Sequence, residues 1–250
     1  MRPLPRLALV WTFLRSFLVQ SSWNYHTMLG TGFAFSMLPT LKRLFGADEE
    51  ELNSALERHV DHFNAHPYLA NIALGAALRM EADGEQPETI RRFKLAVRGP
   101  LGGLGDSLFW ASWLPLVSIL SIALGWAGLL PRWGVVTLFL VLYNLGHLGV
   151  RIWGYREGLR LGRSVGHSLA RLDMSGWSDR LRGWASLVLG VLAALVLTGR
   201  GGLVEAGWIW GALGTVAFTT GLWVGHRAWR PAAALAVVAI GLISIWGVVR

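Results

Sequence analysis

The hydrophobic positions follow two different patterns in the two halves of the chain. In the second half, five apolar stretches approach the roughly 20 residues that a helix needs to cross a bilayer. They are Trp113–Leu130, Trp133–Val150, Trp184–Leu197, Gly207–Val224 and Ala232–Val249. Because lipid offers no hydrogen-bond partner for exposed backbone amides, we expect these stretches to be helices.

The first half is apolar but interrupted. Ser22–Leu44 and Pro67–Met80 contain glycines and, in the first case, Pro39, and they are too short or too broken for clean spans. Interrupted apolar segments rich in Gly and Pro often mark binding regions in transporters. Between them, Ala47–Phe63 places its charged residues on one side and leucines on the other, which predicts an amphipathic helix.

The first 18 residues predict a further helix. Arg2, Arg6 and Arg15 are spread through this segment, so it lacks the uninterrupted apolar stretch of a cleavable signal peptide. The pattern instead favours an amphipathic helix on the cytoplasmic surface of a membrane.

These patterns predict an all-α membrane protein with broken or re-entrant helices in the N-terminal half and about five transmembrane helices in the C-terminal half. The expected divisions are an amphipathic segment over residues 1–14, a core over residues 15–155, and a helical transmembrane region over residues 156–250.

Composition supports a membrane protein over a soluble enzyme. Hydrophobic residues make up 53% of the chain and charged residues 15%, whereas soluble domains contain about 25% charged residues. The chain has no cysteine, which excludes disulfides and thiolate chemistry. The net charge of +8 is not a nucleic-acid signal, because the basic residues lie between the apolar stretches.

The positive charges predict an orientation in the membrane. Thirteen Lys and Arg residues lie in three alternate connections, which are those before the first, third and fifth predicted spans. The opposite side has only Arg132, Arg200 and Arg250. Since cytoplasmic loops are enriched in Lys and Arg, the loop at Arg156–Arg182 should be cytoplasmic and Arg250 external.

Four motifs stand out and together resemble a known family. They are WNY at residues 23–25 followed by GF and MLP, RHVDHFNAHPY at 58–68, GPLGGLGDSLFW at 99–110, and YN at 143–144 followed by Arg151 and WGY. In this order they resemble the IID subunits of the mannose/fructose/sorbose phosphotransferase family. The resemblance covers about Leu14 to Gly162. Many relatives read WNYERMQ where this chain has WNYHTML at residues 23–29.

The resemblance implies a transport function without catalysis in this chain. Family members pair with a IIC membrane subunit and translocate a hexose across the bacterial cytoplasmic membrane, and soluble IIA and IIB proteins phosphorylate the sugar. The implied protein is multi-pass and hetero-oligomeric, and the phosphohistidines belong to IIA and IIB. The alternative is a non-transporting membrane scaffold or sensor derived from the same fold.

Five residues are candidates for sugar contact. A sugar needs amides or carboxylates for its hydroxyls and aromatic side chains for its ring faces. Trp23, Asn24, Asn64, His66 and Asp106 supply such groups within the motifs. An ionisable residue at membrane depth is a functional candidate because its burial is costly, and Asp106 qualifies if the glycine-rich segment enters the bilayer as a loop.

Structural roles are also open for these motifs. Gly99–Gly105 lacks the Lys-Ser/Thr of a phosphate loop and could serve close helix packing. Asp106 could cap a helix that begins near Ser107, and the tryptophans could belong to an interfacial belt. Arg151 and Arg156 fit topology anchors. The histidines at 59, 62 and 66 share a helical face but have no matched carboxylate, so neither a metal nor another cofactor is expected.

Overall fold

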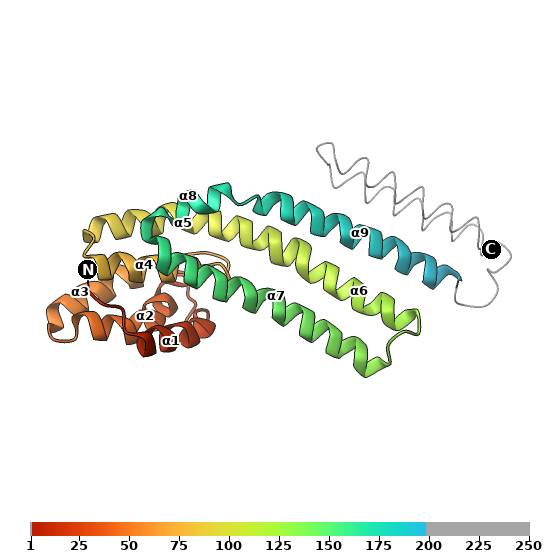
Figure 1. The fold of residues 1–250 in the computed structure, drawn as a ribbon, viewed down its shortest axis with the longest axis horizontal. Coiled ribbons are helices and arrows are strands. Elements are labelled where there is room, and N and C mark those ends of the chain that lie inside the picture. Colours follow the sequence, from red (N-terminus) through yellow and green to blue (C-terminus); the bar gives the residue numbers. More distant parts are fainter. Residues whose placement is uncertain (1, 199–250) are drawn as a thin grey trace. The chain divides into compact units, whose positions relative to one another are not determined.

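The computed structural model describes residues 2–198, and these residues form helices joined by short connections. The elements in chain order are α1 (Arg6–Arg15), η1 (Ser16–Leu18), α2 (Gly30–Phe45), α3 (Glu49–Val60), α4 (Ala70–Asp83), α5 (Pro87–Gly105), η2 (Asp106–Trp113), α6 (Leu114–Trp126), α7 (Arg132–Leu161), η3 (Gly162–Ser164), α8 (Val165–Arg171) and α9 (Met174–Thr198). Figure 1 shows them coloured along the sequence. The all-α prediction is therefore confirmed for the described residues.

The contacts divide the chain into two units. Among the described residues, the first contains residues 2–113 and Leu142–Ser178, and the second contains Leu114–Val141 and residues 179–198. All four sequence motifs lie in the first unit.

Two helices among the described residues are long and apolar enough to cross a membrane. They run over Pro87–Trp126 and Arg132–Arg171 and contain the first two predicted spans almost completely. The third predicted span, Trp184–Leu197, lies within α9. The remaining two, Gly207–Val224 and Ala232–Val249, lie outside the described residues.

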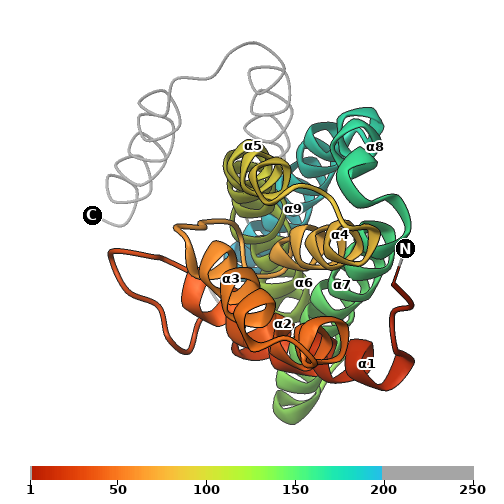
Figure 2. The same ribbon diagram turned by 90° about the vertical axis from the view of Figure 1, so that its left-hand side faces the viewer.

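Helix α4 forms the centre of the first unit. Twelve of its 14 residues are buried, including Asn71 and Glu81, so protein surrounds the helix on all sides. In both Figure 1 and Figure 2, α4 lies between α5 and α2. Most of the segment Pro67–Met80, which is too short for a span, thus belongs to a core helix enclosed by its neighbours.

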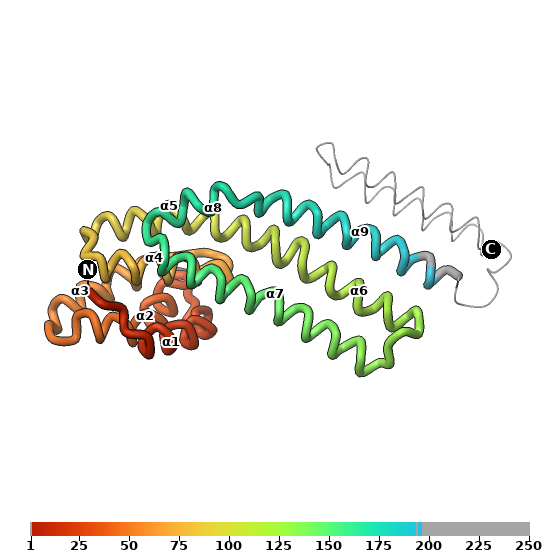
Figure 3. Tube along the Cα trace, in the orientation of Figure 1, coloured from red at the N-terminus to blue at the C-terminus, as the bar shows by residue number. Residues whose placement is uncertain are grey.

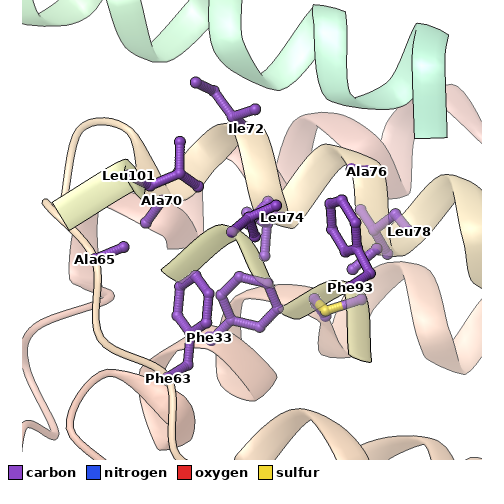
Figure 4. Close-up of a cluster of buried hydrophobic side chains, with 14 of the residues drawn as sticks. Phe33, Phe63, Ala65, Ala70, Ile72, Leu74, Ala76, Leu78, Phe93 and Leu101 are labelled. Carbon is purple, nitrogen blue, oxygen red and sulfur yellow. The ribbon is translucent and has the colours of Figure 1, made fainter. Parts of the chain in front are cut away.

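Aromatic and aliphatic side chains from α2, α4, α5 and the connection after α3 fill the space around α4. Phe33 and Phe63 are fully buried with ring centroids 4.7 Å apart, and Figure 4 shows them next to each other below Leu74. Ile90 and Leu101 of α5 are also fully buried. This core holds the ends of α2 and α3 against α5.

The predicted amphipathic helix at Ala47–Phe63 is confirmed as α3. It begins after Asp48, whose carboxylate accepts a hydrogen bond from the Glu51 backbone N–H at 3.0 Å, as expected for an N-cap residue. Three glutamates follow in the first turn, where the helix dipole favours negative charge.

Two expected interruptions are absent. Helix α2 continues through Pro39, and the glycine-rich segment Gly99–Gly105 forms the last turns of α5. Figure 3 follows this chain directly from α5 into η2, a π-helix, and on to α6. The expectation of a loop at Gly99–Gly105 was therefore wrong, whereas the alternative of close helix packing fits Gly105, which lies directly against His66.

Candidate functional site

The connection before α2 and the connection after α3 pair through their backbones. The Leu29 N–H donates to Phe63 O at 2.8 Å, and the Phe63 N–H donates to Thr27 O at 3.1 Å. Met28, between these bonds, has a positive φ of 53°, which is uncommon for a residue other than glycine and marks a tight bend. The WNY motif and the HFNAHPY motif therefore lie side by side.

Asn24 organises the first of these connections from within. Its side-chain amide donates to Thr27 Oγ1 at 2.8 Å, and its Oδ1 accepts from the backbone N–H groups of His26 and Thr27 at 3.0 and 2.9 Å. Both ends of the side chain are thus used in a turn of the kind that Asn commonly stabilises. The structure gives Asn24 a role in shaping the loop.

The residues that depart from the family motif have a structural use. Thr27 Oγ1 accepts the Asn24 amide and also pairs with the Thr31 hydroxyl at 3.0 Å. Leu29 is buried in the core, whereas His26 is exposed. The loop in this chain is therefore held by short hydroxyl and amide contacts in place of charged side chains.

Gly105 brings the third motif against the second. A Cβ atom at this position would lie 2.1 Å from His66 Cβ, so the close approach requires glycine. At Gly102 the nearest neighbour is Ala65, with 3.9 Å between its Cα and an added Cβ. We call the region formed by residues 23–29, 63–66 and 102–110 the motif junction.

His66 lies in an aromatic environment at this junction. Its ring stacks on Phe109 with centroids 5.2 Å apart and contacts the Trp110 ring at 5.5 Å. Its Nδ1 accepts the Tyr68 N–H at 3.3 Å, while its buried Nε2 has no hydrogen-bond partner among the described residues. Burial, together with the nearby Arg151 guanidinium, lowers the pKa of His66 to about 4.

Tyr68 connects His66 to α7. The Tyr68 and Tyr143 hydroxyl groups are 2.8 Å apart, and the Tyr68 ring stacks on His147 with centroids 4.7 Å apart. The Arg151 guanidinium lies 4.9 Å from the centre of the same ring. We call these five residues, His66, Tyr68, Tyr143, His147 and Arg151, the Tyr68 cluster.

Several polar atoms in and beside the Tyr68 cluster lack a protein partner. Within residues 2–198, these buried atoms without a partner are His66 Nε2, His147 Nδ1, Arg151 Nε and the neighbouring Trp113 Nε1. Leaving one such group unsatisfied costs about 1–3 kcal/mol, so a group of them indicates a place for water or for a polar ligand. Ring faces and hydrogen-bonding atoms in one place suit a hydroxyl-rich molecule.

The remaining predicted site residues lie at the surface of the motif junction. Asn64 and Asp106 are exposed, and Trp23 is 46% exposed with its ring 4.8 Å from that of Tyr25. The structure therefore brings together the segments that carry the five predicted residues. It separates a buried part, with His66, from a surface part, with Asn64 and Asp106.

Two expectations about charged residues are corrected. Asp106 is not a helix N-cap, because α5 continues into η2 and Asp106 itself has helical backbone angles. Arg151 is not an exposed topology anchor, since it is buried between the Phe17 and Tyr68 rings and donates to Ser16 O at 3.2 Å.

The three histidines of the second motif point into different environments. His59 is buried against Glu81 at 2.7 Å, His62 is exposed and contacts Arg98 at 2.9 Å, and His66 joins the aromatic cluster. Among residues 2–198, no group of three His, Asp or Glu side chains is placed to hold a metal ion.

Sequence reasoning missed Tyr68, His147 and the buried role of Arg151. Tyr143 and Arg151 were visible as parts of the fourth motif, and Tyr68 ends the second. Nothing in the spacing indicated that residues 75 positions apart would join their hydroxyl groups. His147 lies outside the four motifs and gave no signal.

The comparison with known proteins covers the part of the chain that carries the four motifs. A family model described as the IID component of the mannose/fructose/sorbose family of the phosphotransferase system matches residues 4–200. The mannose-specific EIID component of Escherichia coli (strain K12) is 35% identical over 190 residues, which cover 74% of this chain and 65% of that protein. The sorbose-specific EIID component of Lacticaseibacillus casei is 34% identical over 170 residues, covering 66% of this chain and 57% of that protein.

The chain thus spans less than two thirds of the length of these curated relatives. A chain in the cryo-EM structure of the mannose transporter ManYZ in complex with microcin E492 (MceA) has a similar fold. The TM-score is 0.61 at 24% identity, with 100% of this chain and 98% of that chain covered.

Proposed function

The chain belongs to the mannose/fructose/sorbose family of phosphotransferase system IID components, and from this premise we propose that it translocates a hexose together with a IIC subunit. In this proposal it is a multi-pass protein of the bacterial cytoplasmic membrane with about five transmembrane helices in its C-terminal half. Soluble IIA and IIB proteins phosphorylate the sugar, and this chain supplies no phosphorylated residue.

The observation that carries the proposal is the convergence of the motifs. Segments separated by up to 80 residues meet at the motif junction through the Thr27–Phe63–Leu29 backbone bonds and the contact of Gly105 with His66. The bend at Met28 is costly, and so is the buried Nε2 of His66, which has no hydrogen-bond partner in the described part of the chain. Such features persist mainly where a function requires them.

The chemistry of the junction supports a neutral, hydroxyl-rich substrate. Asn64 and Asp106 offer an amide and a carboxylate at the surface, and Trp23 and Trp110 offer exposed ring faces. We propose that these residues contact the sugar, with His66 positioned behind them and Asn24 holding the loop. Because the side chains are exposed in the single chain, a IIC subunit would have to close the site.

Sugar binding by the reconstituted IIC–IID pair tests the proposal. If Asn64 and Asp106 each contribute a hydrogen bond, Asn64→Ala and Asp106→Asn should each raise the Kd for the hexose about 5- to 150-fold. The measurement is titration calorimetry in detergent with mannose, fructose and sorbose as separate ligands. Gly105→Ala should weaken binding as well, because the added Cβ displaces His66.

The matched control is Asn53→Ala, which removes an exposed amide on α3 outside the motif junction and should leave the Kd unchanged. Co-purification with the IIC subunit should be retained by every variant. If the wild-type pair binds none of the three sugars, the transport proposal is wrong and the alternative of a non-transporting scaffold is favoured.

A further inference from the structure

Helix α1 and η1 turn large apolar side chains outward. Between Arg6 and Gln20, the exposed residues are all large and hydrophobic: Leu7, Val10, Trp11, Leu14, Phe17 and Leu18. Their exposed fractions range from 40% to 69%. The spacing of 3, 1 and 3 residues along α1 places Leu7, Val10, Trp11 and Leu14 on one helical stripe. We call these six residues the outer face of α1.

The hydroxyl groups of the same segment point inward. Thr12 and Ser16 are buried, and the Thr12 hydroxyl pairs with the Thr40 hydroxyl of α2 at 2.8 Å. Two backbone carbonyls are also used inside the fold, since Leu9 O accepts from Tyr155 Oη at 3.0 Å. Ser16 O likewise accepts from Arg151 Nη1. The outer face thus carries only apolar side chains, whereas the inner side buries the hydroxyl groups of Thr12 and Ser16 beside Leu9 and Phe13.

Soluble monomers rarely expose a large group of neighbouring apolar side chains, and such a group marks a contact with a protein or a membrane. A protein partner would need directional contacts, because protein interfaces carry about one hydrogen bond per 100–200 Å² and a polar rim. Among the six side chains of the outer face, the only polar group is the indole N–H of Trp11. Its composition therefore fits lipid acyl chains better than a subunit surface.

Basic residues lie beside the outer face. Arg6 is exposed directly before Leu7, and Arg15, the last residue of α1, lies 4.7 Å over the Phe35 ring. Basic residues beside Trp, Phe and Leu are typical of helices that lie in the membrane interface. The 12 residues from Leu7 to Leu18 are about 18 Å long at 1.5 Å per residue, too short for the roughly 30 Å hydrocarbon core.

We propose that the outer face of α1 is a lipid-contact surface that inserts into one leaflet of the bilayer, with Arg6 and Arg15 at the anionic headgroups. This surface anchors the first unit to the membrane independently of the two long candidate spans. It requires neither a sugar nor a IIC subunit, so its test is separate from that of the proposed function.

The cysteine-free chain allows a direct test. Leu14→Cys and Val10→Cys are each labelled with an environment-sensitive fluorophore on the full chain, which is reconstituted in vesicles of phosphatidylcholine and phosphatidylglycerol (3:1). Emission is then quenched either by a phosphatidylcholine that carries a spin label on its acyl chain or by aqueous iodide. Both labels should be quenched several-fold by the spin-labelled lipid and little by iodide.

The control is Asn53→Cys on the exposed side of α3, which should show stronger quenching by iodide than by the lipid. The measurement is repeated with a co-expressed IIC subunit, and lipid quenching at Leu14 and Val10 should persist. Iodide quenching at both positions, protection from both quenchers, or loss of lipid quenching when IIC is added would each overturn the proposal.

Discussion

At the scale of single residues, four buried polar side chains hold the end of α3. Glu81 accepts hydrogen bonds at 2.7 Å from Arg58 Nε, Arg58 Nη2 and His59 Nε2. Lys94 donates to the Arg58 and His59 carbonyls at 2.7 and 3.1 Å. A lysine in this place satisfies carbonyls that the last turn of a helix leaves free. The network therefore holds the end of α3 in place, directly before residues 63–66 of the motif junction.

The His59 side chain makes this network sensitive to acid. Its complete burial lowers its pKa to about 4, and the hydrogen bond to Glu81 only partly opposes this effect. If Nε2 carries the hydrogen that Glu81 accepts, protonation adds a second N–H at Nδ1, which has no partner among the described residues. The pKa of Glu81 is also lowered despite its burial, because Arg58 and His59 donate to it.

We predict that stability falls as the pH drops from 6.5 toward 4. The unfolded chain protonates His59 near its ordinary pKa of 6.5, before the folded chain does so near 4. The resulting loss is on the order of 3 kcal/mol for such a histidine, and His66 changes in the same direction. The lowered pKa of Glu81 adds a loss at still lower pH.

Unfolding in mild detergent, followed by tryptophan fluorescence across this pH range, measures the effect. His59→Gln keeps a side-chain donor for Glu81 but cannot titrate, so its stability should depend less steeply on pH. His26→Gln, at an exposed position, should keep the wild-type slope. Parallel curves for all three proteins would show that His59 is not responsible.

At the scale of elements, glycines allow α4 and α7 to approach closely. A Cβ atom at Gly158 would lie 2.3 Å from Ile72 O, and one at Gly75 would lie 2.3 Å from Tyr155 O. Gly154 and Gly158 are four residues apart and face the same helix. This is the arrangement by which small residues bring membrane helices into contact. The crossing also sets the position of Tyr68 relative to His147 and Arg151.

Gly158→Ala should therefore destabilise the first unit by about 1–3 kcal/mol, because the methyl group forces the helices apart. Gly166→Ala in α8 is the matched control, since nothing lies within 4 Å of a Cβ there. This control should be neutral or stabilising by up to about 1 kcal/mol, as alanine favours a helix. Thermal unfolding in detergent compares the two, and equal stability of both variants would contradict the close-packing argument.

At the scale of the whole molecule, the distribution of basic residues predicts the orientation of the chain. Between the second and third predicted spans, six arginines lie from Arg156 to Arg182, whereas the connection between α6 and α7 is followed by a single one, Arg132. The positive-inside bias places the first connection in the cytoplasm and the second outside.

Single cysteines test this orientation in intact cells. Cysteine at Ser175, an exposed position at the start of α9, should resist an impermeant thiol reagent. Cysteine at Leu129, which is 70% exposed between α6 and α7, should react. Permeabilised cells should label at both positions. The opposite labelling pattern in intact cells would mean that the predicted orientation is inverted.

The sequence by itself determined the class of structure and the family. Helix type follows from contacts three or four residues apart, so the pattern at Ala47–Phe63 was sufficient to predict α3. The apolar stretches after Trp113 similarly predicted α6 and α7. The four motifs identified the family because their order and residue types are a property of the chain alone.

Only the tertiary structure decided which environment each motif residue occupies. Gly99–Gly105 has the composition of a loop, yet it is helical. Because Gly105 has no side chain, His66 can pack directly against its backbone. Arg151 has the position of a topology anchor, yet the Phe17 and Tyr68 rings and Ser16 O bury it. These contacts join residues up to 135 positions apart. The local spacing of residues does not indicate which distant segment will pack beside a given side chain. That contact is determined by the tertiary packing.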